Sequence, residues 1–294
     1  MIYVNKERGS WMKRLMRSII TLMLVTSVII VSTTTAVAAG TGKHIDYVAF
    51  GDSVAAGVLY GGPNYPGAGS GLGYTDKIAE KLEQTGVLAS FNKEFAVSGE
   101  TAAGLAAKTA VLNVKDTPQW HLVKNAEIVT LDIGANDLLA PLYSYFVPMI
   151  ADHKSDLYLN PGKVMADVAA LIGNTDVTSK GAEIQGNIET ILQNILNANK
   201  KVKIYVMGYY NPLPALAAQY DLNLDPQVDI LNNLIKGAIS NAIADNKGVS
   251  INYVDTKDIM KTNEYLVPMD IHPTALGYQA IADEFWKQIK PDLR

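Results

Sequence analysis

Residues 44–53 read HIDYVAFGDS, a short apolar run that ends in a glycine and is followed by an acid and a serine. An apolar run of this length that is bounded by a turn residue is typical of a buried β-strand. Four later runs have the same character, at residues 91–97, 127–133, 202–207 and 249–254. The chain is therefore predicted to contain five strands.

Amphipathic stretches separate these runs. Tyr74, Ile78 and Leu82 lie four residues apart and predict a helix over residues 74–84. Further apolar stripes of this kind occur at residues 184–196, 231–242 and 281–289. Strands that alternate with helices need crossover connections, so the sequence predicts one α/β domain with a mostly parallel five-stranded sheet and helices on both faces. Residues 138–177 are less regular and predict an excursion over one end of the sheet, either a lid or an ordinary surface segment.

The composition is that of an ordinary globular protein. The chain has 294 residues, a formal net charge of −4 and no cysteine. The lack of cysteine excludes disulfides, a cysteine nucleophile and thiolate metal sites. Because the net charge is negative, there is no overall excess of basic residues that would indicate nucleic acid as a partner. The glycine-rich residues 57–73 have neither G-x-G-x-x-G spacing nor a P-loop lysine, which disfavours a phosphate cradle.

Residues 1–39 have the pattern of a secretory signal peptide. A basic start is followed by a charge-free apolar run and by the small-residue pattern Ala36-Val37-Ala38. The apolar run is shorter than the roughly 20 residues of a spanning helix, which favours cleavage over an uncleaved anchor. We expect cleavage near Ala38 or Ala39, a secreted domain of residues 40–294, and membrane contact only through the segment before cleavage.

Ligands of open α/β sheets bind beyond the carboxyl ends of the strands, so the residues that follow the strands are candidates for a site. Ser53, Gly99 and Asn136 follow the first three predicted strands, and His272 precedes the last predicted helix. Each also has a purely structural explanation. Ser53 is a favoured helix cap, and Gly99 suits a tight turn. Asn136 or Asp137 can cap a helix that begins at Leu138. His272 can mark a helix boundary, with Pro273 as the first helical residue.

Together, these four residues offer a hydroxyl, a glycine N–H, a side-chain amide and an imidazole. Acyl transfer needs a serine hydroxyl that a base activates. It also needs preorganised donors for the negative charge of the tetrahedral intermediate. The set therefore predicts a serine hydrolase.

Four short blocks resemble the SGNH/GDSL hydrolase family, in the order of that family: GDSVAAG at 51–57, VSGET at 97–101, GANDLL at 134–139 and DIHPTALGY at 270–278. The resemblance implies a flavodoxin-like, three-layer α/β/α sandwich. It implies that Ser53 is the nucleophile and that His272 is the general base and then the general acid. It also implies an oxyanion hole of the Ser53 and Gly99 N–H groups and the Asn136 amide, without a metal or an organic cofactor.

The catalytic acid departs from the family pattern. The family places it three residues before the histidine, where this chain has Met269, whereas Asp270 lies two residues before. Residues two apart in an extended chain point to the same face, so Asp270 can reach the imidazole and fix its tautomer. Two alternatives stay open, a Ser–His dyad oriented by a backbone carbonyl and an acid from elsewhere, such as Asp255 or Asp258.

The leading functional hypothesis is a secreted serine esterase or lipase that cleaves a lipid or small-molecule ester through an acyl-enzyme. A carbohydrate esterase that deacetylates extracellular polysaccharide is the alternative within the same chemistry. A non-catalytic cell-surface binding module is a second class, for which Ser53→Ala would have no effect. A metallohydrolase is a third, which EDTA would inactivate, but no two histidines have metal-ligand spacing.

Overall fold

The computed structural model describes residues 44–58, 73–138, 167, 177–212, 223–262, 264–266 and 271–293. Its five strands are β1 (Ile45–Gly51), β2 (Leu88–Ala96), β3 (Ile128–Asp132), β4 (Lys203–Met207) and β5 (Ser250–Val254). All paired strands are parallel, and their order in the sheet is β2-β1-β3-β4-β5. This is the flavodoxin-like order, so the predicted fold class is confirmed.

The direction of winding changes between β1 and β3. The chain passes from β1 outward to β2, returns to β3 on the other side of β1, and continues outward to β5. A topological switch point of this kind leaves a crevice beyond the carboxyl ends of the two strands, which is where ligands bind in open α/β sheets. Gly51 and Asp132 are register partners at that end of the sheet.

The central strands are apolar because both of their faces are covered. Every residue of β3 is buried, and β1 and β4 each contain only one half-buried residue. The edge strand β2 is more exposed and begins at Leu88, three residues before the predicted start. Two stacked aromatic pairs between register partners, Tyr47 with Phe91 and Phe50 with Phe95, pack β2 against β1.

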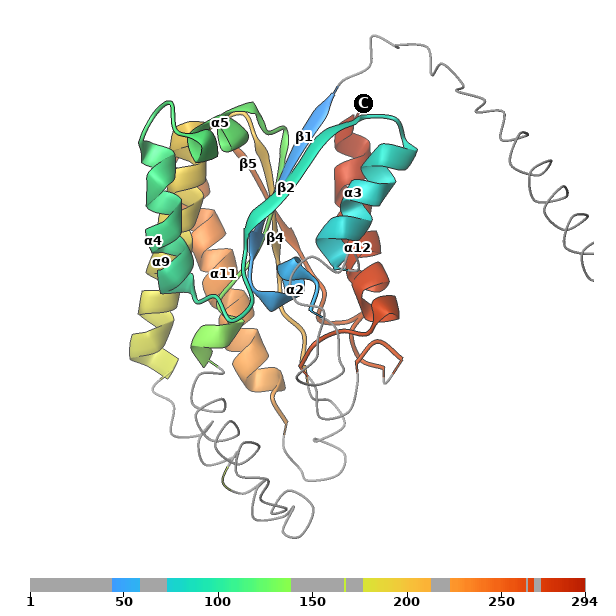
Figure 1. Ribbon diagram of the computed structural model, residues 1–294. Coiled ribbons are helices and arrows are strands. Elements are labelled where there is room, and N and C mark those ends of the chain that lie inside the picture. Colours follow the sequence, from blue (N-terminus) through green and yellow to red (C-terminus); the bar gives the residue numbers. More distant parts are fainter. Residues whose placement is uncertain are drawn as a thin grey trace, which may run out of the picture. The chain divides into compact units, whose positions relative to one another are not determined.

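The described helices include α2 (Ser53–Ala56), α3 (Tyr74–Gln84), α4 (Ala102–Thr109), α5 (Pro118–Asn125), α9 (Val177–Ala198), α11 (Asp225–Asp245) and α12 (Ala275–Ile289), with 3-10 turns η1 (Ala110–Asn113) and η2 (Lys290–Leu293). Helices α3 and α12 cover one face of the sheet, and α4, α9 and α11 cover the other (Figure 1). All four predicted helices are confirmed, and α9, α11 and α12 extend beyond the predicted stripes. The result is the predicted three-layer sandwich.

The two helices between β2 and β3 were not predicted. Thr101 caps α4 by accepting the Gly104 N–H at 3.1 Å. Thr117 caps α5, in which Pro118 is the first residue. Each of these helices has only eight residues, and α5 buries only Val123. Such short helices carry little apolar periodicity, which is why the sequence pattern did not reveal them.

Two predicted segments fall outside the described residues. The signal segment, residues 1–39, does so entirely, and the excursion at 138–177 does so except at three positions. The chain divides into two compact units, residues 1–42 and 43–294, and the second contains all of the elements above. No helix in the described ranges is long and apolar enough to cross a membrane.

Two glycines bring together the ends of the segment that joins α2 to α3. Gly57 ends α2 with a φ of 85°, and a Cβ at this position would lie 2.7 Å from the backbone nitrogen of Gly73. We expect Gly57→Ala to lower the free energy of unfolding by about 2–4 kcal/mol, because it combines backbone strain with a backbone clash. Urea unfolding measures this loss.

Gly86 provides the matched control for this substitution. Its φ is 73°, but in the described part of the chain no residue beyond its two neighbours has an atom within 4 Å of the position that a Cβ would occupy. Gly86→Ala therefore adds the strain alone, at about 1 kcal/mol. Equal losses for the two variants would show that the contact with Gly73 is without energetic consequence.

Candidate active site

Ser53 lies on the sharp turn between β1 and α2. Gly51 has a φ of 150°, and a Cβ there would meet Oδ1 of Asp132 at 2.4 Å, so only glycine lets β1 end this close to β3. The Asp52 carboxylate then caps α2 by accepting the Val54 N–H at 2.8 Å. Asp52, rather than Ser53, is therefore the helix cap, and the Ser53 hydroxyl is not used for capping.

His272 lies beside the Ser53 hydroxyl. Its Nε2 is 2.9 Å from Oγ of Ser53, although 219 positions separate the two residues in the sequence. This is a hydrogen-bond distance, and the tautomer of the imidazole decides which atom donates. Ser53 is 6% exposed and His272 is half-buried. The fold thus brings together the hydroxyl and the imidazole that the sequence singled out.

The start of α12 fixes the segment that carries His272. The Thr274 hydroxyl accepts the Gly277 N–H at 3.1 Å, and the Thr274 N–H donates to the Tyr265 carbonyl at 2.8 Å. The helix therefore begins at Ala275. The expectation that Pro273 is its first residue is wrong, because the better cap, a threonine, follows the proline.

Gly99 and Asn136 follow the two strands that flank β1. Gly99 is exposed and has a φ of 77°, while Asn136 is buried in a helical turn that begins at residue 135, earlier than expected. The Asn136 Nδ2 donates to the Glu100 carbonyl at 2.8 Å, which uses one of its two hydrogens and orients the amide. Within the described ranges, the backbone N–H groups of Ser53 and Gly99 donate to no other residue. Both can therefore donate to a ligand.

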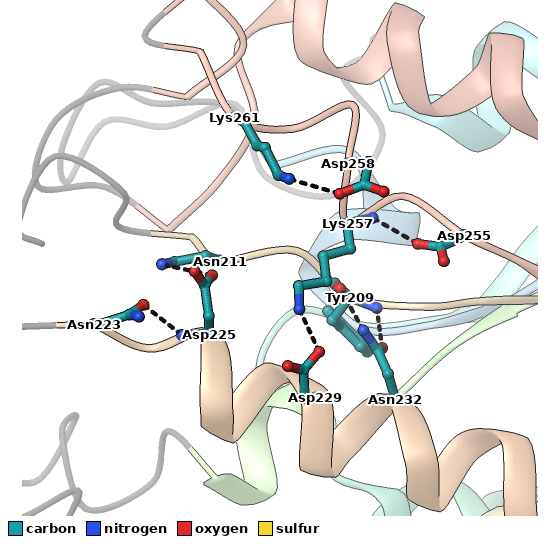
Figure 2. A network of polar contacts seen from close by, with 10 residues as sticks. All are labelled: Tyr209, Asn211, Asn223, Asp225, Asp229, Asn232, Asp255, Lys257, Asp258 and Lys261. Carbon is teal, nitrogen blue, oxygen red and sulfur yellow. Dashed lines mark hydrogen bonds and ion pairs between the residues drawn. The ribbon is translucent and has the colours of Figure 1, made fainter.

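Asp270, the predicted acid, lies outside the described residues. The alternatives Asp255 and Asp258 are both exposed. Asp255 accepts the Lys257 N–H at 2.9 Å, and Asp258 pairs with Lys261 at 2.6 Å (Figure 2). The hydrogen bond from Lys261 lowers the pKa of Asp258. Both acids belong to the network of surface contacts in Figure 2. Neither is therefore assigned as the acid that orients His272.

A buried acid beneath Ser53 was not predicted. Asp132, the last residue of β3, is fully buried, and its Oδ1 accepts the Tyr74 hydroxyl at 2.6 Å. Its Oδ2 lies 3.4 Å from the backbone nitrogen of Asp52 and 3.3 Å from that of Ala55. The available signal was an acid near the end of the apolar run IVTLDI at residues 128–133, because acids are almost never fully buried unless they are paired.

Tyr209 is a second residue that the sequence did not reveal. It follows β4, and its hydroxyl donates to Oδ2 of Asp52 at 2.7 Å. Asn232 of α11 accepts the Tyr209 N–H at 2.6 Å and donates to the Tyr209 carbonyl at 2.8 Å (Figure 2). Helix α11 thus fixes the tyrosine that holds the cap of α2.

Burial dominates the electrostatics around the turn. It raises the pKa of Asp52, and it raises the pKa of Asp132 well above its ordinary value. The charge of Asp52 raises the pKa of Asp132 further, whereas the interaction with Asp132 lowers the pKa of Asp52. A positive charge on His272 also lowers the pKa of Asp52. Burial raises the pKa of Tyr74 and of Tyr209, so both stay protonated as donors.

Comparison with known proteins identifies one family. The family model described as GDSL-like Lipase/Acylhydrolase family matches residues 49–280, which include the turn at Ser53 and the segment at His272. A comparison with curated protein sequences found no match.

Solved structures share the fold at low sequence identity. The lipase Lip_vut3 from a goat rumen metagenome is 19% identical, with a TM-score of 0.50, over 83% of this chain and 96% of that one. LAE5, an alpha/beta hydrolase enzyme from the metagenome of Lake Arreo, is 18% identical, with a TM-score of 0.54, over 84% and 95%. The lipase/acylhydrolase from Enterococcus faecalis is 17% identical, with a TM-score of 0.52, over 85% and 97%.

Proposed function

Since the chain belongs to the GDSL-like lipase/acylhydrolase family, a family of ester hydrolases, we propose that it hydrolyses carboxylic esters through an acyl-enzyme on Ser53. The observation that carries the proposal is the 2.9 Å contact between Oγ of Ser53 and Nε2 of His272. A serine hydroxyl is a weak nucleophile until a base within hydrogen-bond reach removes its proton. His272 is that base.

The first half-reaction forms the acyl-enzyme. As Oγ of Ser53 bonds to the carbonyl carbon of the ester, Nε2 of His272 takes the hydroxyl proton. The negative charge that develops on the carbonyl oxygen is met by the backbone N–H groups of Ser53 and Gly99 and by the second hydrogen of the Asn136 amide. The bond from the carbonyl carbon to the alcohol oxygen then breaks, and His272 returns the proton to the departing alcohol.

The second half-reaction releases the acid. His272 removes a proton from a water molecule, which attacks the acyl carbon of the acyl-enzyme, and the same three donors stabilise the second tetrahedral intermediate. The bond to Oγ breaks and Ser53 regains its proton. Apart from the ester and the water, this scheme uses only side chains and backbone groups of this chain.

Asp270 is the acid that we assign to orient His272. Its position two residues before the imidazole supports a hydrogen bond to Nδ1 at little conformational cost. We expect Asp270→Asn to lower kcat strongly and Asp255→Asn, the exposed control, to leave kcat unchanged. The reverse result would transfer the role to Asp255.

We propose a lipid or small-molecule acyl ester as the substrate class. Turnover of p-nitrophenyl esters of increasing chain length, measured beside acetate release from acetylated xylan, tests this assignment. We expect turnover of esters longer than acetate. Release of acetate from xylan without turnover of octanoyl esters would favour a carbohydrate esterase instead.

We also propose that the protein is exported. The basic start, the short apolar run and Ala36-Val37-Ala38 support a cleaved leader of residues 1–39. The N-terminal sequence of protein recovered from the culture medium tests this proposal. A start near Gly40 is expected, and an intact Met1 on cell-bound protein would contradict it.

A further inference from the structure

Two fully buried carboxyls, those of Asp52 and Asp132, lie beneath the nucleophile. Asp52 is 1% exposed and Asp132 is 0% exposed. Within the described ranges, neither forms an ion pair with a lysine or an arginine. Two adjacent buried carboxylates that both carry charge would repel each other in a medium that solvates charge poorly. One proton shared between them removes that repulsion, as in other carboxyl pairs.

The hydrogen bonds distinguish the two acids. Asp52 accepts two short bonds, from the Val54 N–H at 2.8 Å and the Tyr209 hydroxyl at 2.7 Å. Asp132 accepts one short bond, from the Tyr74 hydroxyl at 2.6 Å, whereas its two backbone contacts are long, at 3.3 and 3.4 Å. The charged form is favoured where more good donors converge, which is at Asp52.

We propose that Asp52 and Asp132 share a single proton beneath Ser53, with Asp132 as the neutral donor and Asp52 as the anion, and that this pair positions the nucleophilic turn. The proposal rests on the proposed function in one respect only, namely that Ser53 is the residue that must be positioned. The proton lies on an oxygen of Asp132 and is directed at the Asp52 carboxylate.

The single charge has two consequences at the site. It caps α2, and so it fixes the backbone N–H of Ser53 as a donor toward the substrate. The same charge interacts favourably with His272 and therefore favours the imidazolium that forms while His272 holds the Ser53 proton. Asp52 is thus a positioning residue that acts through Ser53 and His272, and Asp132 acts through Asp52.

Other titratable groups around the pair keep their protons. Tyr74 faces it from α3 and Tyr209 from the end of β4, while Tyr47 of β1 interacts with Asp132 from within the sheet. Burial raises the pKa of each of these tyrosines. His272 is the titratable base that interacts with Asp52. Among these groups, the shared proton is therefore assigned to the carboxyl pair and not to a tyrosine.

Unfolding measurements between pH 5 and 7 test the shared proton without using activity. The pKa of Asp132 is raised in the folded state, so its contribution to stability is complete below the pKa of the unfolded chain and is lost as pH rises toward the folded pKa. The unfolding constant of the wild type relative to that of Asp132→Asn is expected to rise about tenfold per pH unit. Asp245→Asn, which removes an exposed carboxyl at the end of α11, is expected to leave the pH dependence unchanged. Parallel curves for the wild type and Asp132→Asn would overturn the proposal.

The wild type alone provides a second measurement if Asp132→Asn does not fold. The infrared spectrum of the folded protein at pH 7 is expected to contain the C=O stretch of one protonated carboxyl. Absence of that band would overturn the proposal. Fluorophosphonate labelling of the same preparation separates the proposed function from the shared proton. If Ser53 is labelled and the band is absent, the proposed function stands and only the shared proton is refuted.

The pH profile of activity tests the positioning role. Asp52→Asn removes the charge from the α2 cap, so we expect kcat/KM to fall at least about tenfold more than in Asp132→Asn, in which the charge stays on Asp52. The acidic limb of the Asp52→Asn profile is expected to move to lower pH, because the imidazolium loses a favourable charge. Equal losses with unshifted limbs would show that the two acids are only structural.

Discussion

Ser53→Ala is expected to lower kcat/KM for a p-nitrophenyl ester by about 10⁴- to 10⁶-fold. The substitution removes the oxygen that would bond to the acyl carbon, while the turn that holds it is built from Gly51, Asp52 and Asp132 and does not use the hydroxyl for capping. The free energy of unfolding is therefore expected to change little. Initial rates, measured together with urea unfolding, check both statements.

The double variant with His272→Ala makes this prediction sharper. His272→Ala alone is expected to cost nearly as much as Ser53→Ala, because the hydroxyl and the imidazole act as one unit at 2.9 Å. The double variant is expected to be little worse than either single variant. Additive losses would contradict the view that His272 acts by activating Ser53.

Asn136→Ala is expected to lower kcat by about 10²- to 10³-fold and to change KM much less. The amide donor meets charge that develops on the carbonyl oxygen in the transition state and is largely absent from the bound ester. Steady-state kinetics separates the two parameters. A change confined to KM would show that Asn136 binds the substrate rather than the oxyanion.

Asn194 supplies the control for the structural part of that loss. Asn136 and Asn194 are both 6% exposed, and Asn194 forms side-chain hydrogen bonds with Asn113 and Thr109, which lie outside the active-site turn. Asn194→Ala therefore removes a buried amide of the same kind, so we expect a loss of stability with kcat unchanged. A fall in kcat equal to that of Asn136→Ala would mean that general loosening of the fold lowers activity.

The sheet could be predicted because its strands are short apolar runs that end in glycine or in a polar residue. β1 and β3 are almost wholly buried, and most of their residues are apolar. The beginning of β2 was missed because it lies at the sheet edge, where Ser90 is exposed and the apolar signal is weak. The helices α4 and α5 were missed because eight residues provide barely two turns of apolar periodicity.

The site was predictable where a residue type carries the chemistry by itself. Ser53 was singled out as a hydroxyl after a strand end and His272 as an imidazole before the last helix, and the structure places the two side chains 2.9 Å apart. Asp132 and Tyr209 were not found, because their importance comes from contacts with Asp52 across 80 and 157 positions of sequence. Long-range contacts of this kind depend on the strand order, which apolar periodicity does not specify.

The capping residues were also hard to assign from sequence alone. Asp52 and Ser53 are adjacent and both are favoured caps, and only the dihedral angles of the turn decide that Asp52 takes the role. The same ambiguity at Pro273 and Thr274 displaced the predicted start of α12 by two residues. At the start of α2, a shift of the cap by one residue decides whether the Ser53 hydroxyl binds the helix backbone or faces the His272 imidazole.

Labelling with a fluorophosphonate probe tests most directly whether Ser53 is a nucleophile that His272 activates. The probe bonds covalently to an activated serine oxygen and loses fluoride, and mass spectrometry of the digested protein identifies the modified residue. We expect capture of the folded wild type at Ser53, and labelling at least about 10³-fold slower in His272→Ala. Capture of a different serine, or no capture of a folded wild type, would contradict the account.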